Sequence, residues 1–216
     1  MFTMYKTGVE TRQNILRCAK KLFYENGFKD TSVFSICREA EVQPGTFTYH
    51  FPKKNDLLHS IYTDYMQSCI AFLDSCGLDL HPAEHHLYVL ALYYSHLYCD
   101  KKLVSFHREV MEIASMNVWF DNPRRLISGF SGEGKEINDN ERFDLFVKAD
   151  NAARRELNLD FINEGDYSLP GIMKLLKDIY TINAKLFDVD YSLMEQYLED
   201  AYGFALKNMG ARLRLL

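Results

Sequence analysis

The chain has 216 residues, of which 47% are hydrophobic and 25% are charged. This composition excludes an intrinsically disordered chain and provides enough apolar surface for one large domain or two smaller ones. The formal net charge of −5 is unevenly distributed, because residues 1–60 carry nine Lys and Arg against six Asp and Glu, a balance of +3, which leaves −8 for the remainder.

Three short helices are predicted in the N-terminal quarter. Apolar residues at helical spacing indicate a first helix from about residue 10 up to Gly27, which ends it. A second helix is expected over residues 33–40 and a third over residues 44–50, where Pro44 occupies a first-turn position that tolerates proline. Two short helices joined by a turn of three or four residues form a helix-turn-helix unit.

Six further helices are expected in the rest of the chain, because apolar residues recur at helical spacing between breaks that contain Pro and Gly. They are predicted at about 54–73, 83–99, 102–116, 140–162, 170–187 and 191–209. Residues 121–139 contain Asn122-Pro123 and three glycines and are predicted to form a long loop. The last two helices are joined by a few residues and should be antiparallel neighbours. The fold class predicted is therefore all-α, with about nine helices.

The sequence shows no signal peptide, no membrane-spanning segment and no disulfide pattern. The N-terminus lacks the apolar core and cleavage site of a signal peptide, and the most apolar later segment, around 87–97, is too short to span a bilayer. We therefore expect a cytoplasmic protein with no membrane partner. The cysteines are odd in number and form no Cys-x-x-Cys pair, so we expect small core residues and neither a disulfide framework nor a thiolate metal site. They are Cys18, Cys37, Cys69, Cys76 and Cys99.

The sequence offers one cluster with metal-ligand side chains. His81, His85 and His86 surround Glu84, and His81 and His85 are four residues apart. Pro82 marks the start of a helix, so His81 precedes the regular turn that would align it with His85, and a solvated helix start is the better interpretation. The chain also lacks a nucleophile elbow, a phosphate-binding glycine loop and a dinucleotide fingerprint. We therefore expect no catalytic residues, no metal and no cofactor.

Many positions between Thr11 and Leu58 follow one known pattern. They are Arg12, Ile15-Leu16, Ala19, Leu22-Phe23, Gly27, Thr31-Ser32, Ile36, Ala40, Val42, Gly45-Thr46, Tyr49-His50-Phe51, Lys54 and Leu57-Leu58. This segment resembles the DNA-binding head of the TetR family of bacterial transcriptional regulators. The resemblance implies a helix-turn-helix DNA-binding domain over 8–68 and an effector-binding and dimerisation domain over 69–216. It also implies a sequence-specific regulator, by family default a repressor, whose binding to palindromic double-stranded DNA responds to a small molecule.

The residues expected to contact DNA lie at the start of the second helix, along the third, and at the start of the fourth. The N-terminal end of a recognition helix favours phosphates, hydroxyls can bond phosphates or base edges, and a basic head attracts DNA. The predicted contacts are Thr31, Ser32, Gln43, Gly45, Thr46, Thr48, Tyr49, His50 and Lys54. Capping is expected to be part of the role of Thr31 and Ser32.

Three positions depart from the family pattern. Glu41 stands where Gly is usual in the turn, which costs free energy if the backbone there is left-handed. Thr48 replaces a common aromatic, and Gln43 replaces a common Ser or Thr cap. These departures leave the fold prediction intact but prevent an operator sequence from being borrowed from the family.

An effector pocket is expected among aromatic and polar residues of the fourth to sixth helices. Aromatic walls with a few hydroxyl groups and a His suit a flat or amphipathic organic ligand, although the same stripe is also typical of an ordinary core. The candidates are Tyr62, Tyr65, Met66, Cys69, Tyr88, Leu92, Ser95, His96, Phe106 and Met111.

A homodimer is expected to form through the last two helices, whose apolar residues exceed those needed for packing inside one subunit. The candidates are Ile172, Leu175, Ile179, Ile182, Leu186, Met194, Tyr197, Leu198, Ala201, Phe204 and Ala205. Two alternative functions stay open from the residues alone. One is a dimeric helical scaffold that binds protein, and the other is an unrecognised enzyme in the C-terminal domain.

Overall fold

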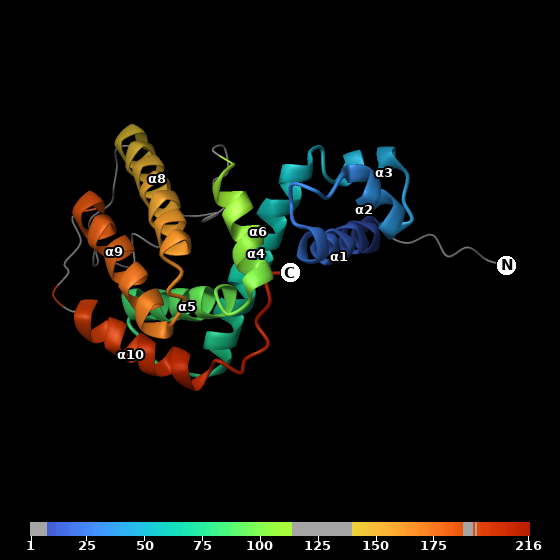
Figure 1. Cartoon of the computed structure of the whole chain (residues 1–216). Coiled ribbons are helices and arrows are strands. Elements are labelled where there is room, and N and C mark those ends of the chain that lie inside the picture. The colour runs from blue at the N-terminus through green and yellow to red at the C-terminus, as the bar shows by residue number, and fades with distance from the viewer. Residues whose placement is uncertain (1–7, 114–139, 188–191, 193) are drawn as a thin grey trace.

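The computed structural model describes residues 8–113, 140–187, 192 and 194–216. Within these residues the chain forms nine helices and no strand (Figure 1). The helices are α1 (Gly8–Asn26), α2 (Val33–Ala40), α3 (Pro44–His50), α4 (Lys54–Ser75), α5 (Pro82–Leu97), α6 (Lys101–Met111), α8 (Asn140–Glu164), α9 (Leu169–Phe187) and α10 (Met194–Lys207). The predicted all-α fold is confirmed.

The bounds of the N-terminal helices agree closely with the sequence-based expectation. Helices α2 and α3 begin and end at the expected residues. Helix α6 begins after Asp100, whose carboxylate accepts from the backbone N–H of Lys102 at 2.7 Å. It ends at Met111, earlier than expected, and α10 begins at Met194, later than expected. The loop predicted at 121–139 lies outside the described residues.

Helix α4 connects the two parts of the molecule. Helices α1, α2 and α3 form a head at one end, and α4 runs from this head into the body (Figure 1). Its N-terminus is fixed by Asp56, whose carboxylate accepts from the backbone N–H of Lys53 at 2.7 Å. Because α4 contacts α1 at one end and α5 further along, its broad apolar band has two partners. The domain boundary expected near residue 68 falls inside this continuous helix.

Helix α5 is the centre of the body. Every residue from His86 to Leu97 is buried, and α5 contacts α4, α9 and α10. A helix that is buried on all sides needs apolar residues all round, which explains why this segment shows no single polar face. Helices α8 and α9 pack against each other, and α9 and α10 lie in contact next to α5.

The five cysteines differ in burial. Cys18, Cys37 and Cys69 are buried, but Cys76 and Cys99 are exposed, so the expectation that all five cysteines are core residues is wrong for these two. Both follow the end of a helix, where the chain leaves the core.

No helix in the described ranges is both long and apolar enough to cross a bilayer.

The three histidines near the start of α5 have separate environments. The ring of His81 caps the helix by accepting from the backbone N–H of Ala83 at 3.2 Å. His85 lies 2.8 Å from a carboxylate oxygen of Asp74, and His86 is buried. Among the described residues, no group of three or more His, Cys, Asp or Glu side chains is arranged to hold a metal ion.

Candidate nucleic-acid interface

Helix α2 is held at its N-terminus by a capping box. The hydroxyl of Ser32 accepts from the backbone N–H of Ser35 at 3.0 Å, and the hydroxyl of Ser35 accepts from the backbone N–H of Ser32 at 3.1 Å. This arrangement satisfies two backbone donors that a helix start otherwise leaves unpaired. Because Ser32 is exposed, its hydroxyl lies at the surface while it caps the helix.

The turn between α2 and α3 contains a strained residue. Glu41 has φ 54° and ψ 42°, the left-handed conformation that disfavours residues with a Cβ. The conformation ends α2, because the backbone N–H of Val42 can then donate to the carbonyl of Cys37 at 3.0 Å. The free-energy cost predicted at Glu41 for a left-handed backbone is therefore present, because the backbone there is left-handed.

Helix α3 is attached to the head by one buried ring and presents its other side to solvent. Phe47 is 1% exposed, and its ring lies 6.0 Å from that of Phe51. The exposed residues of this helix and its N-cap are Gln43, Pro44, Gly45, Thr48 and Tyr49. This short helix is thus free to lie against another molecule without disturbing the packing of the head.

The exposed face of α3 combines a bare backbone with aromatic and polar groups. No atom lies within 4 Å of the Cβ that a side chain would add at Gly45, so the backbone is open there. Tyr49 is 83% exposed, and its ring makes an edge contact with the ring of His50 at 5.0 Å. The hydroxyl of Thr48 donates to the carbonyl of Pro44, while Thr46 is half-buried.

Two predicted DNA contacts already have partners inside the head. Thr31 is 2% exposed, and its hydroxyl donates to the carbonyl of Gly27 at 2.7 Å. The ammonium of Lys54 donates to the carbonyls of Phe28 and Thr31 at 2.8 and 2.9 Å and lies 4.1 Å from the centre of the Phe28 ring. Burial lowers the pKa of Lys54. Their contacts with DNA stay predictions, but the structure gives both side chains a role in holding the loop before α2.

The exposed cation at the start of α4 is Lys53, which the sequence analysis did not select. It is the N-cap residue of α4 and is exposed, whereas Lys54 is half-buried. The family pattern predicts a DNA contact for Lys54. The sequence alone does not show that the ammonium of Lys54 is bonded to the loop at Phe28 while that of Lys53 is exposed.

The head is tied to α6 of the body. The ammonium of Lys29 pairs with the carboxylate of Glu112 at 2.5 Å. The phenol of Tyr24 donates to Asp100 at 2.8 Å, and the rings of Phe23 and Phe106 stack at 5.7 Å. Polar and apolar contacts therefore join α1 and the loop after it to α6 and to the residues that flank α6.

The predicted effector residues lie in the core of the body, and most of their polar groups are paired. All of them except Met66 are buried. The phenol of Tyr62 lies 2.7 Å from Nδ1 of His107, and the phenol of Tyr65 donates to the carbonyl of Tyr93 at 2.7 Å. Burial raises the pKa of the Cys69 thiol to about 12.

These candidates do not all face one place. Tyr62 stacks with Phe106 at 6.2 Å, whereas the ring of Tyr88 lies 4.9 Å from Phe204 of α10. Nδ1 of His96 forms a hydrogen bond with the carbonyl of Leu92. The hydroxyl of Ser95 donates to the same carbonyl. Leu92, Cys69 and Met111 are buried core residues. Whether any of the set contacts an effector stays a prediction.

The residues predicted for the dimer interface are largely used inside the subunit. Buried within the single chain are Ile172, Leu175, Ile179, Met194, Leu198, Ala201 and Ala205, while Ile182, Leu186, Tyr197 and Phe204 are half-buried. Helices α9 and α10 both pack on α5, which covers much of the apolar surface that the sequence analysis assigned to a second subunit. The contact between subunits stays a prediction.

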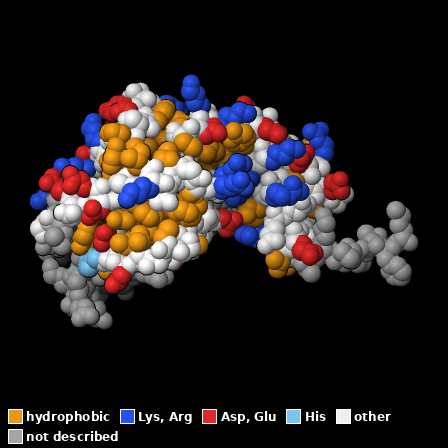
Figure 2. Space-filling model, turned by 90° about the horizontal axis from the view of Figure 1, so that it is seen from below, with side chains coloured by type: hydrophobic (Ala, Val, Ile, Leu, Met, Phe, Trp, Pro, Cys, Tyr) orange, Lys and Arg blue, Asp and Glu red, His pale blue; other side chains and the backbone are white. Residues whose placement is uncertain are grey.

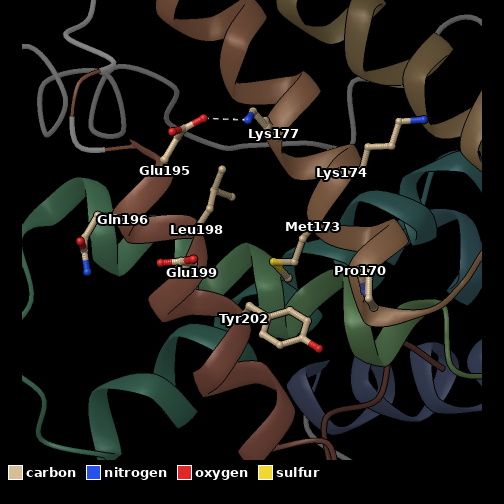
Figure 3. Close-up of a pocket in the computed structure, with 9 residues that line it drawn as sticks. All are labelled: Pro170, Met173, Lys174, Lys177, Glu195, Gln196, Leu198, Glu199 and Tyr202. Atoms are coloured by element: carbon tan, nitrogen blue, oxygen red, sulfur yellow. Dashed lines mark hydrogen bonds and ion pairs between the residues drawn. The ribbon is translucent and has the colours of Figure 1, made fainter.

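The outer side of α9 and α10 carries an open groove of about 660 Å³. Figure 3 shows that residues of both helices line it, with Met173 and Pro170 on one side and Leu198 and Tyr202 on the other. Lys177 and Glu195 bridge the two helices by an ion pair of 2.9 Å. Seen from the side on which α10 lies, apolar side chains gather over the body (Figure 2).

Comparisons with known proteins agree with the geometry of the head. Residues 15–61 match the family described as bacterial regulatory proteins, tetR family. The HTH-type transcriptional regulator UidR of Escherichia coli strain K12 is 34% identical over 71 residues, which are 33% of this chain and 36% of UidR. The HTH-type transcriptional regulator AcrR of Shigella flexneri is 42% identical over 53 residues, 24% of this chain and 25% of AcrR. The aligned segment thus spans much less than two thirds of either relative.

The likeness in fold extends over most of the chain. The crystal structure of RolR in complex with its ligand resorcinol superposes with a TM-score of 0.51 and 19% sequence identity. The superposition covers 92% of this chain and 94% of RolR.

Proposed function

Because this chain belongs to the tetR family of bacterial regulatory proteins through its N-terminal domain, we propose that it is a transcriptional regulator that binds a specific DNA sequence. The observation that carries the proposal is the exposed face of α3 in a helix-turn-helix unit within the matched residues 15–61. Helix α3 is the second helix of this unit. It is short, Phe47 is its one buried side chain, and its outer side is open, so it suits insertion into the major groove.

The roles proposed for individual residues follow from their positions in the helix-turn-helix unit and, for Gln43, Tyr49 and Lys53, from their exposure. Gln43 and Thr46, at the start of α3, are assigned to base edges, while Tyr49 and Lys53 are assigned to the sugar-phosphate backbone. Lys53 takes the place expected for Lys54, whose ammonium is bonded to two backbone carbonyls.

We propose further that the active form is a homodimer. A single helix-turn-helix head reads too few base pairs for useful specificity, whereas two heads related by a two-fold axis read a palindrome. The outer groove of α9 and α10 is the surface proposed for this contact, because it combines Met173, Leu198 and Tyr202 with charges of both signs. Lys174 and Glu199 at its edges can pair across a two-fold axis.

The body is proposed to bind a small-molecule effector that controls DNA binding. Support comes from the path of contacts between body and head, in which α6 touches α8 on one side and α1 on the other. Arg108 of α6 donates to Asn163 of α8 at 2.6 Å, and Arg155 of α8 donates to the carbonyl of Met111 at 2.6 Å. A ligand that favours one position of α8 would shift the population of head orientations by its differential affinity.

The proposed DNA contact is tested by measuring the affinity of the full chain for a bound duplex over a series of salt concentrations. Lys53→Gln is expected to reduce the affinity about threefold to tenfold and to lower the salt slope by about one, because one phosphate contact is lost. Tyr49→Ala should weaken binding to all sequences alike. Lys148→Gln serves as the matched control, since it makes the same change at an exposed position of α8 in the body and should leave both the affinity and the salt slope unchanged.

Two results would contradict this proposal. One is an unchanged affinity and salt slope for both Lys53→Gln and Tyr49→Ala. The other is binding by the wild-type chain that does not depend on salt at all, because phosphate contacts always release counterions.

A further inference from the structure

One side of α8 carries a buried polar stripe. Asp150, Arg154 and Asn158 are spaced four residues apart, so they lie on the same side of the helix. They are 9%, 4% and 0% exposed. A buried ion pair stabilises a fold no better than well-packed apolar residues would, so stability alone does not explain this cluster.

The inner end of the stripe is fully bonded. The amide of Asn158 donates to the carbonyl of Arg154 at 2.8 Å, and its oxygen accepts from the phenol of Tyr98 at 2.6 Å. The same amide lies 3.4 Å from the phenol of Tyr94 on α5. Asn158 therefore closes the cluster on the side of the core.

Helices α5 and α9 contribute two more side chains, His86 and Tyr180, whose pKa values are affected by the charge of Arg154. Burial, together with the charge of Arg154, lowers the pKa of His86 to about 3, so this ring is neutral. The ring of Tyr180 on α9 makes an edge contact with the ring of His86 at 5.8 Å. Burial raises the pKa of the Tyr180 phenol, and the charge of Arg154 opposes this rise. The cluster thus contains one cation and one anion, with aromatic rings around them.

The outer end of the stripe has an unused acceptor. Oδ2 of Asp150 accepts from Nε of Arg154 at 2.8 Å, but Oδ1 is buried and has no hydrogen-bond partner among the described residues. Buried carboxylate oxygens are normally paired, because an unpaired one has lost its hydration without replacement. Asp150 is also the most exposed of the three, which makes its end the side from which a ligand arrives.

We infer that this cluster is a binding site for an uncharged ring compound that carries hydroxyl groups. A hydroxyl donates to Oδ1 of Asp150, and the ring packs against Tyr180 and the neighbouring aromatic side chains. A charged ligand fits worse, because Asp150 and Arg154 already neutralise each other and an added charge would stay uncompensated in a buried place. The inference rests on the proposed function only where it names this compound as the effector.

Hydroxylated rings of this kind come from two sources, phenols and sugars, and the experiment separates them. Isothermal titration calorimetry of the full chain is carried out with catechol and with methyl β-glucopyranoside as the two uncharged probes. Benzoate and benzylamine are the charged probes of similar size. Saturable binding of an uncharged probe, tighter than that of both charged probes, is the expected result, and the probe that binds identifies the source.

Variants then locate the site. Asp150→Asn should weaken binding about tenfold, because a charged acceptor is replaced by a neutral one. Asp144→Asn is the matched control, since it makes the same change at an exposed position of the same helix and should leave binding within about twofold. Tyr180→Leu, which removes the aromatic ring proposed to pack against the ligand and keeps an apolar side chain, should also weaken binding and provides a second variant if circular dichroism shows that Asp150→Asn does not fold.

Several outcomes would overturn the inference. They are tighter binding of benzoate or benzylamine, no binding of either uncharged probe at millimolar concentration, and equal binding by the wild type and both site variants. The same preparations are tested for DNA binding. A protein that binds DNA and none of the uncharged probes removes this site and leaves the regulator standing. A protein that binds an uncharged probe but no DNA keeps the site and removes its role as an effector site.

Discussion

The backbone N–H of Lys29 donates to Oε2 of Glu109 over 2.7 Å, and this bond joins two positions 80 residues apart. Lys29 lies in the loop that leads from α1 to α2, and Glu109 lies near the end of α6. A carboxylate on α6 thus holds the loop that precedes the helix-turn-helix unit. A displacement of α6 would therefore reach the DNA-binding head directly.

The first prediction concerns the space beside this carboxylate. Gly27 has φ +84°, and a Cβ there would meet Oε1 of Glu109 at 2.7 Å. Gly27→Ala should lower the free energy of unfolding by about 2 kcal/mol, from backbone strain together with displacement of Glu109. Gly77→Ala is the matched control, because φ there is +66° but no atom lies within 4 Å. Urea unfolding measures both, and an equal loss in the two variants would show that Glu109 is not a constraint.

The second prediction concerns the strained turn of the helix-turn-helix unit. Glu41→Gly should raise the free energy of unfolding by about 0.5–1 kcal/mol, because glycine adopts the left-handed conformation without a steric cost. Glu41→Ala keeps the Cβ and should give no such gain. Thermal or urea unfolding of the pair distinguishes them, and a destabilised Gly variant would mean that the side chain of Glu41 contributes more than its strain costs.

The third prediction is a pH dependence of stability. Burial lowers the pKa of His86 to about 3 and that of His107 to about 4, whereas the same rings in the unfolded chain titrate near 6.5. Below pH 6.5 the unfolded state therefore binds more protons, and the free energy of unfolding falls as the pH decreases from 7 to 5. Each ring should account for about 2 kcal/mol at pH 5.

Urea unfolding at pH 7 and pH 5 measures this loss. His86→Phe should remove about 2 kcal/mol of the difference between the two pH values. His59→Gln, at an exposed position of α4, should leave the difference as it is in the wild type. A stability that stays constant over this range would show that the two rings are not held neutral by burial.

The fourth prediction locates the subunit contact. Met173→Glu and Tyr202→Glu each place a charge in the groove between α9 and α10 and should convert the proposed dimer into a monomer. Leu145→Glu on α8, where the side chain is 62% exposed, is the control and should leave the dimer unchanged. Sedimentation velocity at micromolar concentration decides the matter. A folded Met173→Glu dimer, or a monomeric wild type, would remove this groove from the proposal.

Local patterns were enough to predict most of the fold. Gly27, the caps before α2 and Pro44 mark the ends of the first three helices, and these signals act within a few residues of chain. The end of α6 at Met111 lacked such a signal, since no Gly or Pro follows it closely, and the expected helix was too long.

The candidate sites depend on contacts between distant segments, which one sequence does not display. Lys54 and Lys53 are neighbours of the same type, and only the position of the loop at Phe28 shows that one ammonium is occupied and the other exposed. The polar stripe around Arg154 was missed for a related reason. Charged residues on a helix are usually solvated, and their burial becomes evident only when α5 and α9 cover them.

Selection of bound sequences from random duplex DNA tests the proposed regulator most directly. The full chain is expected to enrich one palindromic sequence, with two half-sites separated by about one helical turn, as two heads on a two-fold axis require. Substitution of Gln43 or Thr46 should alter the enriched bases within each half-site, whereas Lys53→Gln should weaken binding without altering them. Failure of the wild-type chain to enrich any sequence over the random pool would contradict the proposed function.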